Sequence, residues 1–272
     1  MLRLDGKIAF ISGIGSVGEG WGNGRATAVL FARQGATVFG TDLNIAAAEK
    51  TVATIRAEGG TANAVTCDMT DSESVKGAVD ACMATAGTLA RHGRIDILVN
   101  NVGGSAPGDP VSMEEEVWHS QMDLNLKSVF LSCKHVLPIM QAQAKGVIVN
   151  IASVAGVRDQ PGRQYIAYAA SKAGVIRMSK AIAIDNAKTG IRCNTVVPGL
   201  MNTPLVSERL ARQIGGNDAE KLIAERNARV PIGQMGDGWD VAHAVLFLAS
   251  DEAKHITATE IVVDGGLTAW RP

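Results

Sequence analysis

The chain has 272 residues, of which 46% are hydrophobic and 19% are charged, with 26 basic and 27 acidic side chains. A chain of this length and apolar content can form one or two domains with a real core, which excludes an intrinsically disordered protein. Because the opposite charges balance, the composition gives no reason to expect nucleic acid or an anionic membrane surface as a partner.

Seven short segments are predicted to be strands, because they are rich in β-branched residues and bounded by Gly, Asp, Asn or Ser. In chain order they cover residues 7–12, 36–41, 62–66, 95–100, 147–152, 191–197 and 260–264. Between them, apolar residues three or four positions apart predict helices. These cover 24–34, 46–58, 72–92, two helices within 113–144, 168–188, a pair within 204–227, and 240–249.

The predicted strands are almost continuously apolar and alternate with helices, as a parallel sheet covered on both faces requires. The sequence therefore predicts the α/β class, with a Rossmann-like doubly wound parallel sheet of about seven strands and helices on both faces. No linker-like run interrupts the series, so residues 1–272 are expected to form a single domain.

Two absences bear on where the protein works. No run of about 18 apolar residues occurs, and charge follows Met1 before any apolar stretch, so neither a membrane span nor a signal peptide is expected. The four cysteines, Cys67, Cys82, Cys133 and Cys193, include no pair at metal-ligand spacing. We therefore expect reduced thiols, no metal site and a cytoplasmic protein.

A glycine-rich loop follows the first predicted strand. Six of the twelve residues from Gly13 to Gly24 are glycine, and the loop leads into a helix. Glycines at such a turn let backbone N–H groups approach a pyrophosphate beside the positive end of the helix dipole. Asp42 follows the second predicted strand, where a carboxylate accepts hydrogen bonds from an adenosine ribose and repels a 2′-phosphate. Because residues 43–45 include no Arg or Lys, the sequence predicts NAD rather than NADP.

The chain has two tyrosines, Tyr165 and Tyr168, and Tyr168 precedes Lys172 by one helical turn. A phenol with a pKa of about 10 is a poor base at neutral pH unless a nearby cation favours the phenolate. Ser153 follows the fifth predicted strand, and ligands bind at the carboxyl ends of parallel strands. These side chains are candidates for proton transfer to or from an alcohol oxygen.

The series of motifs resembles the short-chain dehydrogenase/reductase family, NAD-dependent alcohol dehydrogenase type, over essentially the whole chain. Any single motif is common, whereas the whole series in order and in approximate register is specific. The motifs are the glycine-rich turn, Asp42, Cys67-Asp68-Met69, Asn100-Asn101-Val102-Gly103, Asn125, Ser153, Tyr168-x-x-x-Lys172, Pro198-Gly199 with Thr203, and Val263-Asp264-Gly265-Gly266.

The resemblance implies four catalytic residues. Tyr168 would be the acid/base, and Lys172 would lower its pKa and hold the nicotinamide ribose. Ser153 would hydrogen-bond the substrate oxygen, while Asn125 would hold a water in a proton relay from Lys172 to solvent.

The resemblance also implies a cofactor site, a sheet order of 3-2-1-4-5-6-7 and a homotetramer. Asp68 and Met69 would contact adenine, and Thr203 would bind the carboxamide. Asn101 and Gly103 would line the cofactor cleft. The further cofactor contacts expected are Gly13, Gly22, Asn23, Gly24, Asp42, Tyr168, Lys172 and Pro198.

The sequence departs from the family pattern in three places. The pair Gly22 and Gly24 comes five residues late, which leaves open which glycines contact the pyrophosphate. Tyr168 follows Ser153 by 15 residues, two more than is usual, so an insertion is expected within 157–165. Thr257-Ala258 replaces the usual Thr-Gly before the last strand, where we expect an effect on local packing only.

Two further segments bear on the substrate. The family's substrate lid would cover 204–234, with a hinge at 215–216. Met201, Leu205 and Trp270 are candidate pocket walls, with core or interface positions as the alternative. Arg158 and Arg163 lie between two predicted site residues, so they are candidates to bind an anionic substituent, and a solvated loop is the alternative.

The predicted function is the NAD-dependent oxidation of a secondary alcohol to a ketone, or the reverse, with the direction left open. One alternative is a 3-oxoacyl-type ketoreductase, but such enzymes use NADPH and have docking arginines where Leu131 and Ile184 fall here. An enoyl reductase would space its Tyr and Lys more widely. The other alternative is an NAD-binding redox sensor without turnover, which typically lacks the Tyr or Lys that are both present here.

Overall fold

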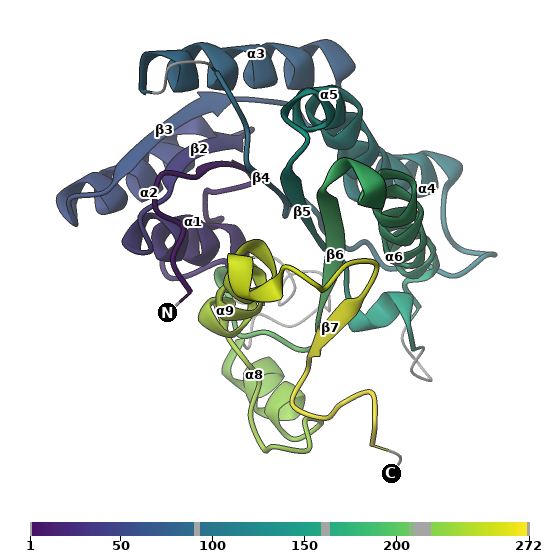
Figure 1. The fold of residues 1–272 in the computed structure, drawn as a ribbon. Helices are drawn as coiled ribbons and strands as arrows, with labels where there is room; N and C mark the ends of the chain where they lie inside the picture. The colour runs from purple at the N-terminus through teal and green to yellow at the C-terminus, as the bar shows by residue number, and fades with distance from the viewer. Residues whose placement is uncertain (1, 90–92, 159–163, 207, 209–218, 271–272) are drawn as a thin grey trace.

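All seven predicted strands form, and they lie side by side in one sheet (Figure 1). The computed structural model describes residues 2–89, 93–158, 164–206, 208 and 219–270. Every neighbouring pair is parallel, and the order β3-β2-β1-β4-β5-β6-β7 is the one that the resemblance implied. The strands are β1 (Ile8–Ser12), β2 (Thr37–Asp42), β3 (Thr61–Thr66), β4 (Ile97–Asn100), β5 (Gly146–Ile151), β6 (Ile191–Pro198) and β7 (Glu260–Val263).

Successive side chains along the strands point to opposite faces of the sheet, and a hydrophobic core lies on each face. Ala9 and Ile11 of β1 belong to one cluster of buried residues, whereas Ile8 and Phe10 belong to another. The first cluster is covered by α1 (Asn23–Arg33), α2 (Ile45–Ala57) and α9 (Gly238–Ala249). The second is covered by α3 (Ser72–Leu89), α5 (Ser128–Gln143) and α6 (Ile166–Asn186). The predicted single, doubly wound α/β fold is confirmed.

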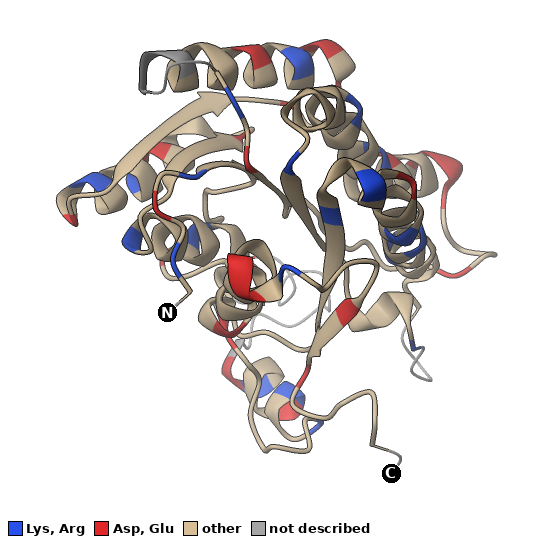
Figure 2. Ribbon diagram, viewed as in Figure 1, with Lys and Arg blue, Asp and Glu red and all other residues tan. Residues whose placement is uncertain are grey.

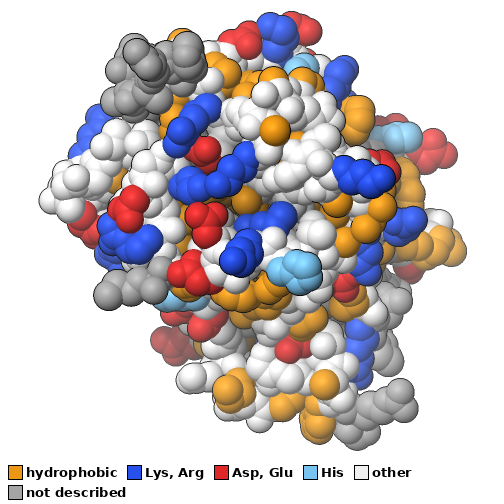
Figure 3. Space-filling view, viewed as in Figure 1, with side chains coloured by type: hydrophobic (Ala, Val, Ile, Leu, Met, Phe, Trp, Pro, Cys, Tyr) orange, Lys and Arg blue, Asp and Glu red, His pale blue; other side chains and the backbone are white. Residues whose placement is uncertain are grey.

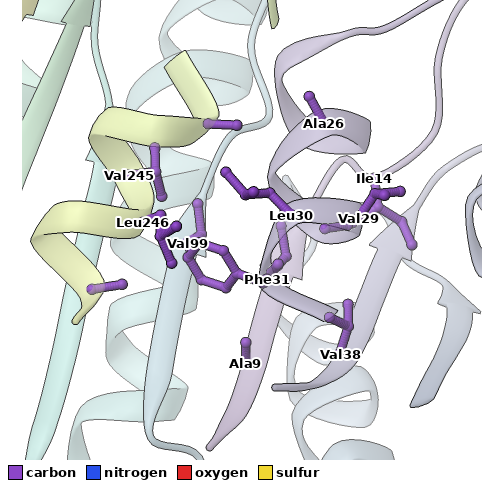
Figure 4. Packing of buried hydrophobic residues seen from close by; sticks show 14 of the residues in the cluster. Ala9, Ile14, Ala26, Val29, Leu30, Phe31, Val38, Val99, Val245 and Leu246 are labelled. Atoms are coloured by element: carbon purple, nitrogen blue, oxygen red, sulfur yellow. The ribbon is translucent and has the colours of Figure 1, made fainter. Parts of the chain in front are cut away.

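Helices α1 and α9 pack against each other over the centre of the sheet. Leu30 and Phe31 of α1 meet Val245 and Leu246 of α9 above Val99 of β4 (Figure 4). All five side chains are at most 6% exposed. Fully burying one Val, Leu or Phe side chain is worth roughly 1.5–3 kcal/mol. This contact therefore fixes the two helices relative to the strand edge on which the site lies.

The other helices agree with the prediction apart from their ends. Helix α4 (Glu115–Met122) runs into α5 through a π-helical turn, η1 (Asp123–Lys127). Helix α6 begins at Ile166, before the predicted start, because Ala167 also faces the core and extends the buried stripe toward the N-terminus. Helix α8 (Ala219–Asn227) is the second of the pair predicted within 204–227. Most of the first helix of that pair lies outside the described residues, as does the predicted helix end at 90–92.

Charged side chains lie over the outer helices and loops, while the central strands carry few of them (Figure 2). On the face shown in Figure 3, Lys and Arg are interspersed with Asp and Glu. In the described part of the chain, no helix has the length and hydropathy needed to cross a membrane. The four cysteines are free and buried, and burial raises the pKa of Cys82 and Cys133 to about 12.

The carboxyl ends of the strands position the site. After β1 the chain passes to α1 on one face, and after β4 it passes to helices on the other face. The two strands are neighbours, so a crevice forms where their following segments diverge. The backbone N–H of Asn101, directly after β4, donates to the Ser12 hydroxyl at the end of β1 over 3.1 Å, which holds the two strand ends together.

Candidate active site

Two adjoining cavities open at the carboxyl edge of the sheet. The larger has a volume of about 760 Å³ and is lined mainly by segments that follow β4, β5 and β6 and by the start of α6. The smaller has a volume of about 290 Å³ and is lined mainly by segments that follow β1, β2 and β3. Five residues line both cavities, which are therefore neighbours: Asn23, Asn101, Gly103, Thr203 and Leu205.

The predicted site residues divide between these cavities. Those expected to act on the substrate or the nicotinamide line the larger one, namely Ser153, Tyr168, Lys172 and Pro198. Those expected at the adenosine and pyrophosphate line the smaller one, namely Gly13, Gly22, Gly24, Asp42, Asp68 and Met69. Of the remaining predicted residues, Asn23, Asn101, Gly103 and Thr203 lie between the two, and Asn125 lines neither.

Close packing shapes the glycine-rich loop. Gly13 has φ +70°, and a Cβ on Gly24 would lie 1.9 Å from the Gly13 carbonyl oxygen, so the start of α1 touches the loop backbone directly. The Asn101 side-chain amide donates to the same carbonyl over 2.9 Å. Gly22 is the N-cap of α1 and makes no side-chain hydrogen bond there, and the first turn of the helix contains no acidic residue. An anion in the smaller cavity would therefore meet the positive end of α1, which fits a pyrophosphate.

The structure locates the residues that lengthen this loop. Residues 13, 15–17 and 22–24 line the smaller cavity, whereas residues 18–21 do not. A Cβ on Gly18 would lie 2.8 Å from Glu208, and one on Gly20 would lie 3.3 Å from Pro204. Gly22 and Gly24 therefore line the cavity although they come late in the sequence, because residues 18–21 bulge away from it.

Asp42 fixes the other end of the smaller cavity. One carboxylate oxygen accepts the Gly15 backbone N–H over 2.9 Å, and the other accepts the Asn44 N–H over 2.9 Å. Each carboxylate oxygen has a second lone pair, so the group can still accept from a ribose hydroxyl. Asp68 is held by Thr70, whose backbone N–H and hydroxyl both donate to it and hold its pKa below the usual range. Met69 is 4% exposed and lies beside it in the cavity wall.

Lys172 and Tyr168 lie together at the start of α6. The Lys172 side chain is 3% exposed, and its Nζ donates to the Ile151 carbonyl at the end of β5 over 3.0 Å. Burial lowers the pKa of Lys172 to about 8. Its Nζ lies 5.8 Å from the centre of the Tyr168 ring. The ammonium is thus held where its charge stabilises a phenolate at Tyr168.

Ser153 reaches the same cavity from the end of β5. It caps the short 3₁₀ turn η2 (Val154–Gly156), and its hydroxyl oxygen accepts the Ala155 N–H over 3.2 Å. This bond orients the hydroxyl beside the start of α6, which packs against η2. Ser153 and Tyr168 therefore line one cavity although 15 residues separate them in the chain.

Asn125 is fully buried in the π-helical turn η1. Its amide donates to the carbonyls of Gly104 and Gln121 over 2.9 and 3.0 Å, and its oxygen accepts the Gly104 N–H over 3.0 Å. A Cβ on Gly103 would lie 2.8 Å from the Asn125 oxygen and 2.9 Å from Lys172 Nζ. The absence of a side chain at Gly103 thus lets Asn125 and Lys172 approach one another behind the cavity wall.

The structure gives Arg158 a contact that the sequence did not predict. Its Nη1 donates to the carbonyls of Leu267, Thr268 and Trp270 over 2.8, 3.0 and 2.7 Å, so it ties the C-terminal segment to the rim of the larger cavity. A role as an anion clamp is therefore not supported for Arg158, and Arg163 lies outside the described residues, as does most of the expected insertion.

The wall of the larger cavity includes one further cation. Met201 and Leu205 line it as expected, while Trp270 is 47% exposed and is not among its lining residues. Arg226 of α8 lines this cavity although it is only 6% exposed. Arg226 is not among the residues predicted from the sequence, because an arginine in a charged, weakly amphipathic helix carries no signal of burial.

A cavity bounded by backbone and carboxylates, next to a phenol beside a buried ammonium, suits the chemistry of nicotinamide-dependent oxidoreductases with a Rossmann-like fold. A family model described as Enoyl-(Acyl carrier protein) reductase matches residues 18–268. The chain belongs to the short-chain dehydrogenase/reductase family, whose members bind a nicotinamide cofactor.

Relatives and solved structures of this family match almost the whole chain. A 3-oxoacyl-[acyl-carrier-protein] reductase of Thermotoga maritima is 38% identical over 98% of this chain and 99% of its own. A cyclohexanol dehydrogenase of Acinetobacter sp. is 38% identical over 98% and 97%. A Burkholderia xenovorans structure assigned to this family has a TM-score of 0.91, with 49% identity over 99% of both chains. A gluconate 5-dehydrogenase from Burkholderia cenocepacia, solved with NADP and tartrate, has a TM-score of 0.85, with 31% identity over 99% and 98%.

Proposed function

We propose that the protein transfers a hydride between NAD(H) and a secondary alcohol or its ketone. The observation that carries the proposal is the buried Lys172 ammonium 5.8 Å from the Tyr168 ring, in a cavity that also receives Ser153. These groups suit proton transfer at an alcohol oxygen, and the adjoining cavity suits a dinucleotide. The family's oxidoreductase activity supports the proposal.

The residues of the smaller cavity fit a dinucleotide without a 2′-phosphate. Among the described residues that line it, Asp42 and Asp68 are acidic, and none is Lys or Arg. Asp42 would accept from the ribose hydroxyls, and the closely packed turn at Gly13, Gly22 and Gly24 would receive the pyrophosphate with Asn23. Asp68 and Met69 would contact adenine. NADP in the Burkholderia cenocepacia relative makes the choice between the two cofactors a question for experiment.

The nicotinamide, when bound, supplies the acceptor or donor of the hydride. We assign its ribose to Lys172 and Asn101, and its carboxamide to Thr203 beside Gly103 and Pro198. In the direction of oxidation, Tyr168 takes the proton from the alcohol oxygen, while Ser153 donates a hydrogen bond to that oxygen. Asn125 would hold a water that returns this proton toward solvent, from its position behind Gly103. In the direction of reduction, Tyr168 gives the proton back.

The proposal also includes a substrate lid and an oligomeric state. Residues 204–234 would form a lid over the larger cavity, and the positions of Leu205 and Arg226 in its wall are consistent with that role. We propose a cytoplasmic homotetramer, for which the exposed Phe130 of α5 and Ile184 of α6 offer apolar contact surface. Sedimentation equilibrium with the full-length protein would test the oligomeric state.

The decisive experiment measures nicotinamide absorbance while the enzyme is given a panel of secondary alcohols with NAD and, separately, with NADP. The proposal expects turnover that is more efficient with NAD, with at least one alcohol. Binding of dinucleotide without turnover of any alcohol or ketone would instead favour a sensor.

A second candidate activity is the reduction of 3-oxoacyl thioesters, which the Thermotoga maritima relative favours. Leu131 is 4% exposed, and Ile184 is exposed but apolar, so neither provides the positive charge that would dock an acidic carrier protein. Assaying a 3-oxoacyl thioester on its carrier protein with NADPH would test this activity, and efficient turnover there would displace the alcohol dehydrogenase proposal.

A further inference from the structure

The extra residues of the glycine-rich loop end in a tryptophan that packs on α9. The ring centres of Trp21 and Trp239 are 4.6 Å apart, with the planes tilted by 52°. Trp239 lies in the first turn of α9, and a Cβ on the preceding Gly238 would lie 2.7 Å from the Trp21 carbonyl oxygen. Backbone and side chain of the loop therefore both contact the beginning of this helix.

Two arginines of α1 extend the ring pair. The Arg25 guanidinium carbon lies 4.6 Å from the Trp21 ring centre, and that of Arg33 lies 5.0 Å from the Trp239 ring centre. Arg25 also donates to the Gly20 carbonyl over 3.0 Å. We call Arg25, Trp21, Trp239 and Arg33 the aromatic clasp. Cation–π and ring–ring contacts in it join the loop, α1 and α9.

The clasp is anchored on both sides. Asp237 is the N-cap of α9 and forms a capping box, because its carboxylate accepts the N–H groups of Trp239 and Asp240, while the Asp240 carboxylate accepts the Asp237 N–H. Arg33 is paired with Glu58 of the neighbouring segment through hydrogen bonds of 2.7 Å. Both rings also pack against the buried cluster between α1, α9 and the sheet.

We propose that Trp21 and Trp239 are positioning residues for the dinucleotide, because the clasp keeps residues 18–21 out of the smaller cavity and holds Gly22 and the first turn of α1 against it. This inference rests on the proposed function, since it assigns that cavity to a dinucleotide. A loop with six glycines in twelve residues has much backbone freedom, and ordering it during binding would weaken affinity. The clasp removes part of that freedom before the dinucleotide arrives.

The experiment compares Trp239→Ala with Trp239→Phe and with Trp270→Ala, which removes an exposed ring outside both cavities. Calorimetric titration with the preferred dinucleotide, without substrate, should give roughly tenfold weaker binding for Trp239→Ala. Trp239→Phe keeps a ring and should recover most of the affinity, and Trp270→Ala should bind normally. In kinetics, Trp239→Ala should raise KM for the dinucleotide while kcat at saturation stays near the wild-type value.

Circular dichroism supplies a readout of the clasp itself. Two indoles in contact give an exciton signal, which should disappear in Trp239→Ala and persist in Trp270→Ala. If Trp239→Ala fails to fold, Arg25→Gln takes its place, because this change keeps both rings and removes the cation with its hydrogen bonds to Gly20 and Thr54. Unchanged dinucleotide affinity in the folded variant, or a fall in kcat with unchanged KM, would overturn the positioning role. If wild type itself binds neither dinucleotide, the proposed function fails as well, which separates the two outcomes.

Discussion

The two cavities are lined by different kinds of chemical groups. The smaller is lined mostly by segments that precede residue 125, and glycine backbone and the Asp42 carboxylate shape it. The larger is lined mainly by residues from β5 onward, including the side chains of Ser153, Tyr168 and Arg226, together with the loop after β4. Backbone packed at contact distance tolerates little change, whereas a wall of side chains can be altered residue by residue. This difference suits a site that receives one constant cofactor and one particular substrate.

The largest effect that separates the cavities is expected from Tyr168→Phe. Loss of the phenolic hydroxyl should lower kcat by the ~10²–10⁴ typical of general acid–base catalysis, while the dinucleotide binds as in wild type. Steady-state kinetics and a dinucleotide titration measure the two effects. Tyr165→Phe, at the other tyrosine that lines the larger cavity, is the matched control and should keep most of the activity. A folded Tyr168→Phe enzyme with near-normal turnover would remove the acid/base assignment.

The second effect concerns the pH dependence of stability, because the folded-state pKa of Lys172 is about 8 against an ordinary 10.5. Below pH 8 the ammonium is charged in both states, and its burial destabilises the fold. Between pH 8 and 10.5 the unfolded chain binds more protons, so the free energy of unfolding rises with pH, by about 3 kcal/mol in total from this group.

Urea unfolding of the protein without cofactor at pH 7 and pH 10 measures this contribution of Lys172 to the free energy of unfolding. Lys172→Met has a side chain of similar length and no charge, so at pH 7 it should have a higher free energy of unfolding than wild type. This difference in the free energy of unfolding should shrink at pH 10. Parallel pH dependences in the two proteins would contradict a buried charge at Lys172.

The third effect belongs to the smaller cavity. Gly24→Ala places a Cβ on the Gly13 carbonyl, so the loop or α1 must move. This clash should outweigh the helical preference of alanine and lower the free energy of unfolding by ~1–3 kcal/mol, and dinucleotide binding should weaken with it. Gly77→Ala in α3 has no neighbour within 4 Å of the new Cβ, so it should raise stability by ~0.5–1 kcal/mol and leave binding unchanged. Equal stabilities of the two variants would refute the contact between loop and helix.

The fourth effect concerns the choice of cofactor. Asp42→Ala removes the acceptor of the ribose hydroxyls and the repulsion of a 2′-phosphate. The ratio of kcat/KM for NAD to that for NADP should therefore fall, by a factor that corresponds to ~1–3 kcal/mol in transition-state free energy. Asp42→Asn keeps an oxygen acceptor for Gly15 but removes the charge and the oxygen that accepts the Asn44 N–H, and because one acceptor remains it should give a smaller fall. More efficient turnover of NADP than of NAD by the wild type would be enough to reject NAD as the cofactor.

The smallest effect lies outside both cavities. Ala258 replaces the glycine usual in the family and adopts φ +59°, a left-handed conformation that glycine takes up freely. Ala258→Gly should therefore raise the free energy of unfolding by about 1 kcal/mol. Thermal unfolding measures it, and KM for both substrates should not change. A less stable variant would mean that the methyl group's packing against the core outweighs the strain.

The elements of this protein could be predicted from the sequence because their signals are local. Apolar runs and three-to-four-residue periodicities predicted all seven strands and most helices to within one or two residues. The family motifs then named many of the residues that line the cavities, since most of those motifs follow strand ends, which parallel strands bring to one edge.

Only the tertiary structure decided the distances between segments that lie far apart in the chain. No local pattern shows that Gly24 touches Gly13 across a bulged loop, that Gly103 lets Asn125 approach Lys172, or that Arg158 binds carbonyls at the C-terminus. The burial of Arg226 and the tilted ring contact between Trp21 and Trp239 are of the same kind. Hydrophobic periodicity reports which face of one element is buried, whereas these contacts depend on how closely two elements pack, and that distance is set by all the side chains between them.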